Sequence, residues 1–100
     1  MHIITQKRIW EAKKKHPEAA TALGGWYQII SKNILPNFSA LKACFNSVDK
    51  VGDLYIFDIG GNKLRLIASI HFNRQKIYIR EILFHKEYDK GHWKKEKVIL

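Results

Sequence analysis

The stretch "LYIFDIGGNKLRLIASIHFNRQKIYIREILF", residues 54–84, decides the fold. Three β-rich segments, 54–59, 63–72 and 77–84, are separated by two short polar turns. In the middle segment apolar residues alternate with others, which is the period of a strand with one buried face. The glycines of the first turn supply the positive φ angles that tight hairpins require. Because short turns join antiparallel neighbours, this stretch predicts a three-stranded antiparallel meander.

The segment before the meander has helical periodicity. Residues 2–4 predict a short first strand, and Thr5 follows at the N-cap position of a basic helix over residues 6–15. A second helix begins at Pro17 and carries apolar residues at spacings of three and four. The segment "ALKACF", residues 40–45, is compatible with either a helical turn or a strand. Helices followed by strands predict an α+β fold, with two helices packed on one face of a small antiparallel sheet and the other face uncovered.

Length and composition place further limits on the protein. One hundred residues, 46% of them hydrophobic, predict one globular domain over residues 1–100, with 96–100 as a tail. The single cysteine, Cys44, allows no internal disulfide, and beside Phe45 it is expected to be a buried small hydrophobe. We find no signal peptide and no apolar run long enough for a membrane span, so we expect a cytoplasmic protein without membrane contact.

The net charge gives the first indication of function. Eighteen Lys and Arg residues oppose nine Asp and Glu residues, which leaves a net charge of +9. The excess of basic residues is spread along the chain and is not confined to a tail. A domain this basic favours a polyanionic partner, and we therefore expect contact with nucleic acid or the ribosome.

Strand alternation predicts a cationic surface on the uncovered sheet face. Lys63 and Arg65 share one face of the middle strand, because they are two residues apart. By the same rule Arg80 should share a face of the last strand with Tyr78 and Ile82. We expect the three cations to meet on the uncovered face if the strand register permits.

A run of polar residues follows the last strand, in "YIREILFHKEYDK", residues 78–90. We expect a short helical segment there, and in such a turn His85 and Tyr88 would lie on one side. RNA cleavage by the 2′-hydroxyl needs a proton acceptor, cations for the phosphate and a proton donor. Arginine suits the phosphate, and histidine, tyrosine or a lysine of lowered pKa suits the proton transfers. No metal-ligand spacing and no glycine-rich phosphate loop is present, so we expect neither a metal nor a cofactor.

Four segments together resemble the HigB family of the RelE/ParE toxin superfamily: "MHIITQKRIWEA", "SALKACF", "YIFDIGGNKLRLIASIHF" and "YIREILFHKEYDKGHW". The resemblance covers residues 1–93. It implies the RelE-like toxin fold and a toxin that cuts mRNA on the ribosome, in the 30S A site. It also implies a HigA-type antitoxin that carries a helix-turn-helix, and operator DNA that is bound only through the antitoxin complex.

The resemblance also implies site residues, and the cationic and aromatic pattern adds others. Arginines are expected to clamp phosphate, His85 or Tyr88 to transfer a proton, and Lys63 and Lys86 to support the charge or supply a base. The predicted catalytic residues are Lys63, Arg65, Arg80, His85 and Tyr88, and the predicted RNA- or ribosome-binding residues are Lys86, His71, Tyr78, Lys90, Lys94 and Lys95.

Two alternative functions fit the same sequence. ParE-type relatives have a similar shape and inhibit DNA gyrase by binding. A basic module that binds RNA or the ribosome without cutting would also show a phosphate-binding face. The convergence of proton-transfer groups near the end of the last strand favours the nuclease, because a gyrase inhibitor needs no such groups.

Overall fold

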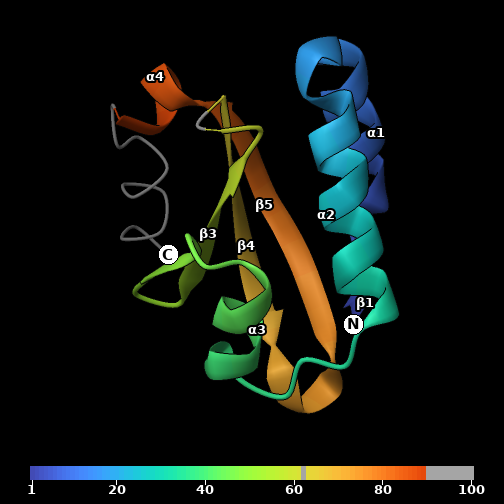
Figure 1. Cartoon of the computed structure of the whole chain (residues 1–100), viewed down its shortest axis with the longest axis vertical. Coiled ribbons are helices and arrows are strands. Elements are labelled where there is room, and N and C mark those ends of the chain that lie inside the picture. Colours follow the sequence, from blue (N-terminus) through green and yellow to red (C-terminus); the bar gives the residue numbers. More distant parts are fainter. Residues whose placement is uncertain (62, 90–100) are drawn as a thin grey trace.

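The computed structural model describes residues 1–61 and 63–89, in which a five-stranded sheet packs against helices. The strands have the order β1-β5-β4-β3-β2, and α1 and α2 lie side by side on one sheet face (Figure 1). α3 lies at the end of the sheet that carries the β4–β5 turn, and α4 lies at the other end. The strands are β1 (His2–Ile3), β2 (Asp49–Val51), β3 (Leu54–Ile59), β4 (Leu64–His71) and β5 (Lys76–Phe84), and the helices are α1 (Gln6–Lys15), α2 (Ala20–Lys32), α3 (Phe38–Cys44) and α4 (His85–Asp89).

The predicted meander is confirmed, but the sheet is larger and mixed. β3, β4 and β5 pair antiparallel in sequence order. β1 pairs parallel with β5, the last strand of the meander, and β2 extends the opposite edge. The ambiguous segment 40–45 belongs mostly to α3, whose N-cap Asn37 accepts a hydrogen bond from the Ala40 N–H. Cys44 ends this helix and is exposed, so the expectation of a buried cysteine is wrong.

Thr5 occupies the N-cap position of α1, but its side chain makes no hydrogen bond to the helix. Its hydroxyl instead accepts the Ile79 N–H at 2.6 Å and donates to the Ile79 carbonyl oxygen at 3.3 Å. The backbone of β5 therefore gains two hydrogen bonds just where its pairing with β1 ends. Thr5 is therefore the N-cap residue, as predicted, but its hydroxyl bonds the edge of β5 and not the first turn of α1.

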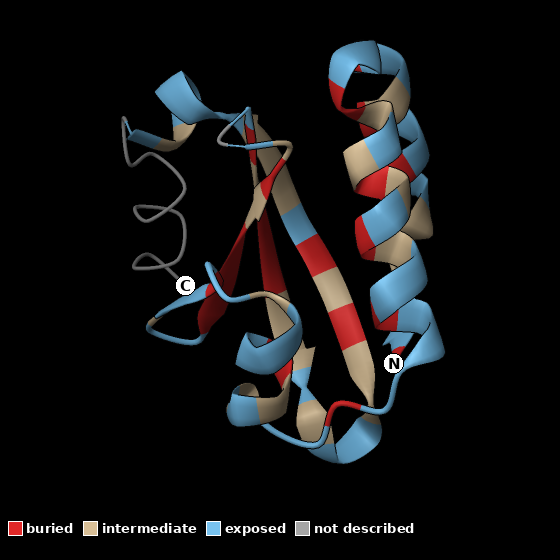
Figure 2. Cartoon of the chain, viewed as in Figure 1, coloured by how far each residue is buried: buried red, intermediate tan, exposed pale blue. Residues whose placement is uncertain are grey.

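The main core lies between the two long helices and the sheet, where buried residues of both layers face each other (Figure 2). Ile9 of α1 and Leu23 of α2 are fully buried against Leu66 of β4 and Ile77 of β5. Each such aliphatic side chain stabilises the fold by about 1.5–3 kcal/mol. None of the helices in residues 1–61 and 63–89 has the length and apolar character that crossing a bilayer requires.

The second face of the sheet, which we expected to be uncovered, carries a smaller core of its own. Leu54, Ile56 and Ile67 are buried there, with exposed fractions of 5%, 3% and 1%. Leu83 of β5 and Tyr88 of α4 pack against them. The expectation of an open, charged face is therefore wrong at its centre, and the polar groups of this face lie toward its ends.

A β-bulge in β5 changes the faces that simple alternation predicts. Ile67 pairs with Glu81 and Ala68 pairs with Ile79, so Arg80 is the extra residue and has no partner on β4. Tyr78 lies before the bulge and Ile82 after it. Tyr78 contacts His71 on the second face, whereas Ile82 packs on the main core. The prediction that Tyr78 and Ile82 share one face is therefore wrong.

Candidate active site

The end of the sheet that carries α4 brings together segments far apart in the sequence. Leu64 and Phe84 form the last residue pair between β4 and β5. Lys63 directly precedes Leu64 and His85 directly follows Phe84, so both lie at this end. The Glu87 carboxylate accepts the Phe84 N–H at 3.3 Å, which closes the first turn of α4. The chain therefore turns sharply at Phe84, as the polar run after the last strand predicted.

Arg65 is the central cation of this end. Its Nη1 lies 3.0 Å from Oδ1 of Asp58, its cross-strand neighbour, and the two side chains are 15% and 23% exposed. The guanidinium carbon lies 5.6 Å from the centroid of the Tyr88 ring, within cation–π range. A carboxylate on one side and an aromatic face on the other thus fix the direction of the guanidinium. A cation held in this way is already oriented to stabilise charge that develops on a phosphate.

Tyr88 is set up to hold its proton. Burial against the second-face core raises the pKa of its phenol, and this effect outweighs the opposing effect of Arg65. The carboxylates of Asp49 and Asp89 raise the pKa further. The phenol is therefore protonated at neutral pH, which suits a proton donor and does not suit a base.

His85 is oriented by a neighbour on the same helix. Its Nε2 lies 3.2 Å from Oδ2 of Asp89, four residues later, and both side chains are about half exposed. Such an exposed pair adds little stability. In the neutral imidazole, a proton on Nε2 faces this carboxylate and leaves Nδ1 as an acceptor. His85 therefore suits the role of a base, complementary to that of Tyr88.

Not all the predicted site residues come together. His71 lies six positions after Arg65 on β4, about 20 Å along the strand. There it contacts Tyr78, with ring centroids 5.5 Å apart. Arg80 lies three residues, or about 10 Å along the strand, before the partner of Arg65 on β5. The structure thus gathers Lys63, Arg65, His85, Lys86 and Tyr88 at one end and leaves Arg80, His71 and Tyr78 farther along the sheet, while Lys90, Lys94 and Lys95 lie outside the described residues.

Three carboxylates that hold the site residues were not predicted from the sequence. Asp58 holds Arg65, Asp89 holds His85, and Glu87 caps the turn into α4. The strands expected from the sequence, 54–59 and 63–72, leave a turn of three residues, which does not pair Asp58 with Arg65. In the structure Ile59 pairs with Leu64, so four residues, 60–63, separate the paired strands and Asp58 lies opposite Arg65. Within the part of the chain that the structure describes, no three His, Cys, Asp or Glu side chains group as metal ligands would.

Comparisons with known proteins agree on one family. A model of the HigB_toxin family, described as the RelE-like toxic component of a toxin–antitoxin system, matches residues 19–91. The mRNA interferase toxin HigB of Escherichia coli (strain K12) is 44% identical over 92 residues, which covers 89% of this chain and 88% of the relative. The mRNA interferase HigB of Escherichia coli O6:H1 (strain CFT073) is 33% identical over 93 residues, 90% of each chain. The chain thus belongs to the HigB toxin family.

Proposed function

We propose that the protein is an mRNA endoribonuclease that acts on the ribosome without a metal ion. The observation that carries the proposal is the pairing of an oriented imidazole and a protonated phenol on one short helix, with Arg65 against the phenol ring. Two relatives that are 33% and 44% identical are named mRNA interferases, which supports the same activity.

The proposed reaction needs only side chains of this chain. His85 takes the proton of a ribose 2′-hydroxyl, and the resulting oxygen attacks the adjacent phosphorus. Arg65 stabilises the charge on the phosphoryl oxygens. Tyr88 donates its proton to the departing 5′-oxygen, and Lys63 and Lys86 add positive charge around the phosphate. The products are a 2′,3′-cyclic phosphate and a 5′-hydroxyl, so protons and bonds balance.

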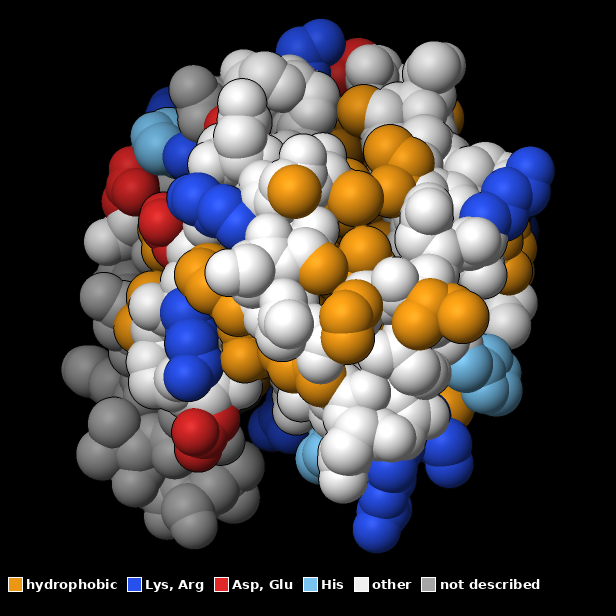
Figure 3. Space-filling view, turned by 60° about the horizontal axis from the view of Figure 1, so that its bottom comes forward, with side chains coloured by type: hydrophobic (Ala, Val, Ile, Leu, Met, Phe, Trp, Pro, Cys, Tyr) orange, Lys and Arg blue, Asp and Glu red, His pale blue; other side chains and the backbone are white. Residues whose placement is uncertain are grey.

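The charge distribution supports a large polyanionic partner. Figure 3 shows that Lys and Arg side chains also stand around the rim of the opposite end of the molecule, with apolar side chains at the surface between them. Together with the net charge of +9, this dispersion supports many weak phosphate contacts on a ribosome. The 30S A site is the proposed location of cutting, since mRNA is exposed there as single strands.

A toxin of this family implies an antitoxin partner. We propose a HigA-type antitoxin with a helix-turn-helix, through which the complex binds operator DNA, and a cytoplasmic location for toxin and antitoxin. Lys90, Lys94 and Lys95, together with His71, Tyr78 and Arg80, are proposed to contact RNA or ribosome beyond the cut phosphate.

Primer extension on mRNA from cells that express the protein tests the proposal. We expect discrete cuts within the coding region, and no cuts when an Arg65→Ala variant is expressed at the same level. Intact mRNA with DNA damage would indicate the gyrase inhibitor instead. Intact mRNA with ribosome-bound protein and blocked translation would indicate a binding module. Protein stripped with EDTA and then assayed on programmed ribosomes at constant Mg²⁺ should cut at the rate of untreated protein, which tests whether it carries a metal ion of its own.

A further inference from the structure

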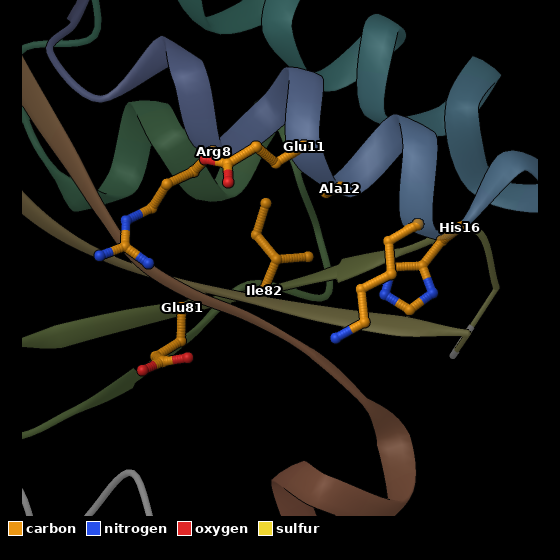
Figure 4. A pocket seen from close by; sticks show the side chains of 7 residues that line it. Arg8, Glu11, Ala12, His16, Glu81 and Ile82 are labelled. Carbon is orange, nitrogen blue, oxygen red and sulfur yellow. The ribbon is translucent and has the colours of Figure 1, made fainter.

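A buried histidine joins the helical layer to the start of α4. His16 follows the last residue of α1, and its side chain lines a pocket of about 150 Å³ between α1 and the end of β5 (Figure 4). Only 2% of His16 is exposed. Its N–H donates to the Ala12 carbonyl at 2.8 Å, and its carbonyl accepts the Ala19 N–H at 2.9 Å. The backbone from which the imidazole projects is therefore held by hydrogen bonds on both sides.

The ring of His16 packs edge-to-face on Phe84, with centroids 4.2 Å apart and planes at 81°. Phe84 is the last residue of β5, and α4 begins at the next residue. Within the described residues β5 pairs with β1 only at Lys76 and Ile77, so no strand covers Phe84 on its outer side. The imidazole is thus a close ring contact between the helical layer and the point where the chain turns into α4.

α4 depends on such contacts for its position. A helix of five residues has no stability of its own in water. The Tyr88 ring anchors α4 on the second-face core, and at its beginning the Glu87 carboxylate accepts the Phe84 N–H at 3.3 Å. The beginning of α4 is thus tied to Phe84, so a contact that holds Phe84 also places α4.

We propose that His16 is a positioning residue, which holds Phe84 and thereby sets the placement of His85 and Tyr88 on the scissile phosphate. The role rests on the proposed function, because it assigns the catalytic groups to α4. His16 does not touch the RNA. It acts through its ring contact with Phe84. Among the described residues, no other aromatic ring contacts Phe84.

The surroundings of the ring support this role. Among the residues that the structure describes, Nδ1 of His16 is buried without a hydrogen-bond partner, and a carboxylate oxygen of Glu18 lies 3.9 Å from it. A buried nitrogen without a partner is unfavourable, so what the site uses is the shape of the ring and its edge against Phe84. A phenylalanine should therefore replace it, since the adjoining pocket can take the extra volume.

The first experiment measures single-turnover cutting on programmed ribosomes, normalised to folded protein, together with ribosome affinity. We expect His16→Ala to cut about ten- to a hundredfold more slowly, because small displacements of catalytic groups have effects of this order, while affinity stays within about twofold. His16→Phe should restore the rate to within about threefold. Phe84→Ala tests the other side of the contact at an exposed position, and its effect should not add to that of His16→Ala.

Trp10→Ala is the matched control. Trp10 lies on α1 and also makes an aromatic contact, with Tyr27 at 5.4 Å, but its partner belongs to α2 and not to the α4 end. We expect this variant to cut at the wild-type rate. If it slows cutting as much as His16→Ala, the effect is a general loss of helix packing and the inference is overturned.

A second readout needs no catalysis. With ¹³Cζ-labelled tyrosines, the signal of Tyr88 is identified by its loss in Tyr88→Phe, and its titration reports how firmly α4 sits on the second-face core. His16→Ala should lower the pKa of Tyr88 toward that of ordinary tyrosine, and Trp10→Ala should leave it unchanged. An unchanged Tyr88 titration, or a failure of His16→Phe to restore the rate, overturns the inference. Absence of cutting by the wild type would overturn the proposed function alone, since the titration still decides whether His16 anchors α4.

Discussion

Tyr88→Phe separates a catalytic from a packing role, because it removes one hydroxyl and keeps the ring. The phenyl ring can still pack against Leu54 and Ile56 and face the guanidinium of Arg65. The cost in stability is therefore limited to the contacts of one hydroxyl, about 0.5–1.5 kcal/mol. Loss of a proton donor lowers a rate by about 10²–10⁴-fold, which equals about 2.7–5.5 kcal/mol of activation free energy. A packing role thus predicts a small loss of stability with little change in the cutting rate per folded molecule, whereas a catalytic role predicts a large loss of rate.

The assay is single-turnover cutting on programmed ribosomes, with ribosome affinity and unfolding free energy measured on the same preparations. If Tyr88 is the acid, the rate falls by about a hundredfold or more while affinity is unchanged. Tyr27→Phe is the matched control, since it also removes one tyrosine hydroxyl, which donates to Gln6 in the helical layer and belongs to no proposed site. A Tyr88→Phe rate within about threefold of the wild type would refute the assignment, and the proton would have to come from another group.

Four further outcomes are expected. Thr5→Val removes both hydrogen bonds to Ile79 and should lower the free energy of unfolding by about 1–3 kcal/mol in a urea titration. Cutting per folded molecule should be unchanged. Equal unfolding midpoints would contradict the idea that the Thr5 hydroxyl ties α1 to β5. Arg65→Lys keeps the charge but loses the planar fork, so cutting should fall about 10²–10³-fold, whereas the exposed Arg74→Lys should cut normally. Ribosome co-sedimentation should weaken steeply with salt, by about 0.7–0.9 in log–log slope per neutralised phosphate, and a flat response would exclude charge as the driver. Folding raises the pKa of Tyr88 above the ordinary value of 10.0, so the protonated phenol stabilises the fold. This stabilisation is present below pH 10.0 and is lost as pH rises through the raised pKa. In urea titrations, Tyr88→Phe should remove this loss of stability at alkaline pH.

The fold followed from the sequence wherever the hydrophobic period was long and regular. The helix α2 and the three meander strands are examples, because several apolar positions agree there on one face. β2 was missed, since a three-residue strand with no buried residue shows no period. Asn37 caps α3 and decides a segment whose own residues suit a strand equally well, so the deciding information lay outside the segment.

The candidate site was predicted in its residue types but not in its geometry. Arg65, His85 and Tyr88 came from the alternation of the middle strand and the polar run after Phe84. The bulge at Arg80 could not be seen in the sequence. Residues still alternate between the two sheet faces before and after the inserted residue, and only the face to which each later residue belongs is exchanged. A strand without the bulge would place Ile82 on the face of Tyr78, away from the main core. The bulge returns Ile82 to that core and turns Leu83 toward Arg65.

That reversal also explains why the site lies at the α4 end. With Leu83 on the second face, the small core of Leu54, Ile56 and Ile67 extends to the last turn of β5, and Tyr88 can pack on it. The same contact that holds the five-residue α4 in place partly shields the phenol from water and raises its pKa. Position and protonation state of the proposed acid therefore share one cause, the burial of its ring. A substitution that loosens that burial should misplace the hydroxyl and lower its pKa together, so the two effects cannot be separated by mutating the apolar residues under the ring. Only a change to the hydroxyl itself isolates the chemistry, which is why the Phe substitution is more informative than Ala at this position.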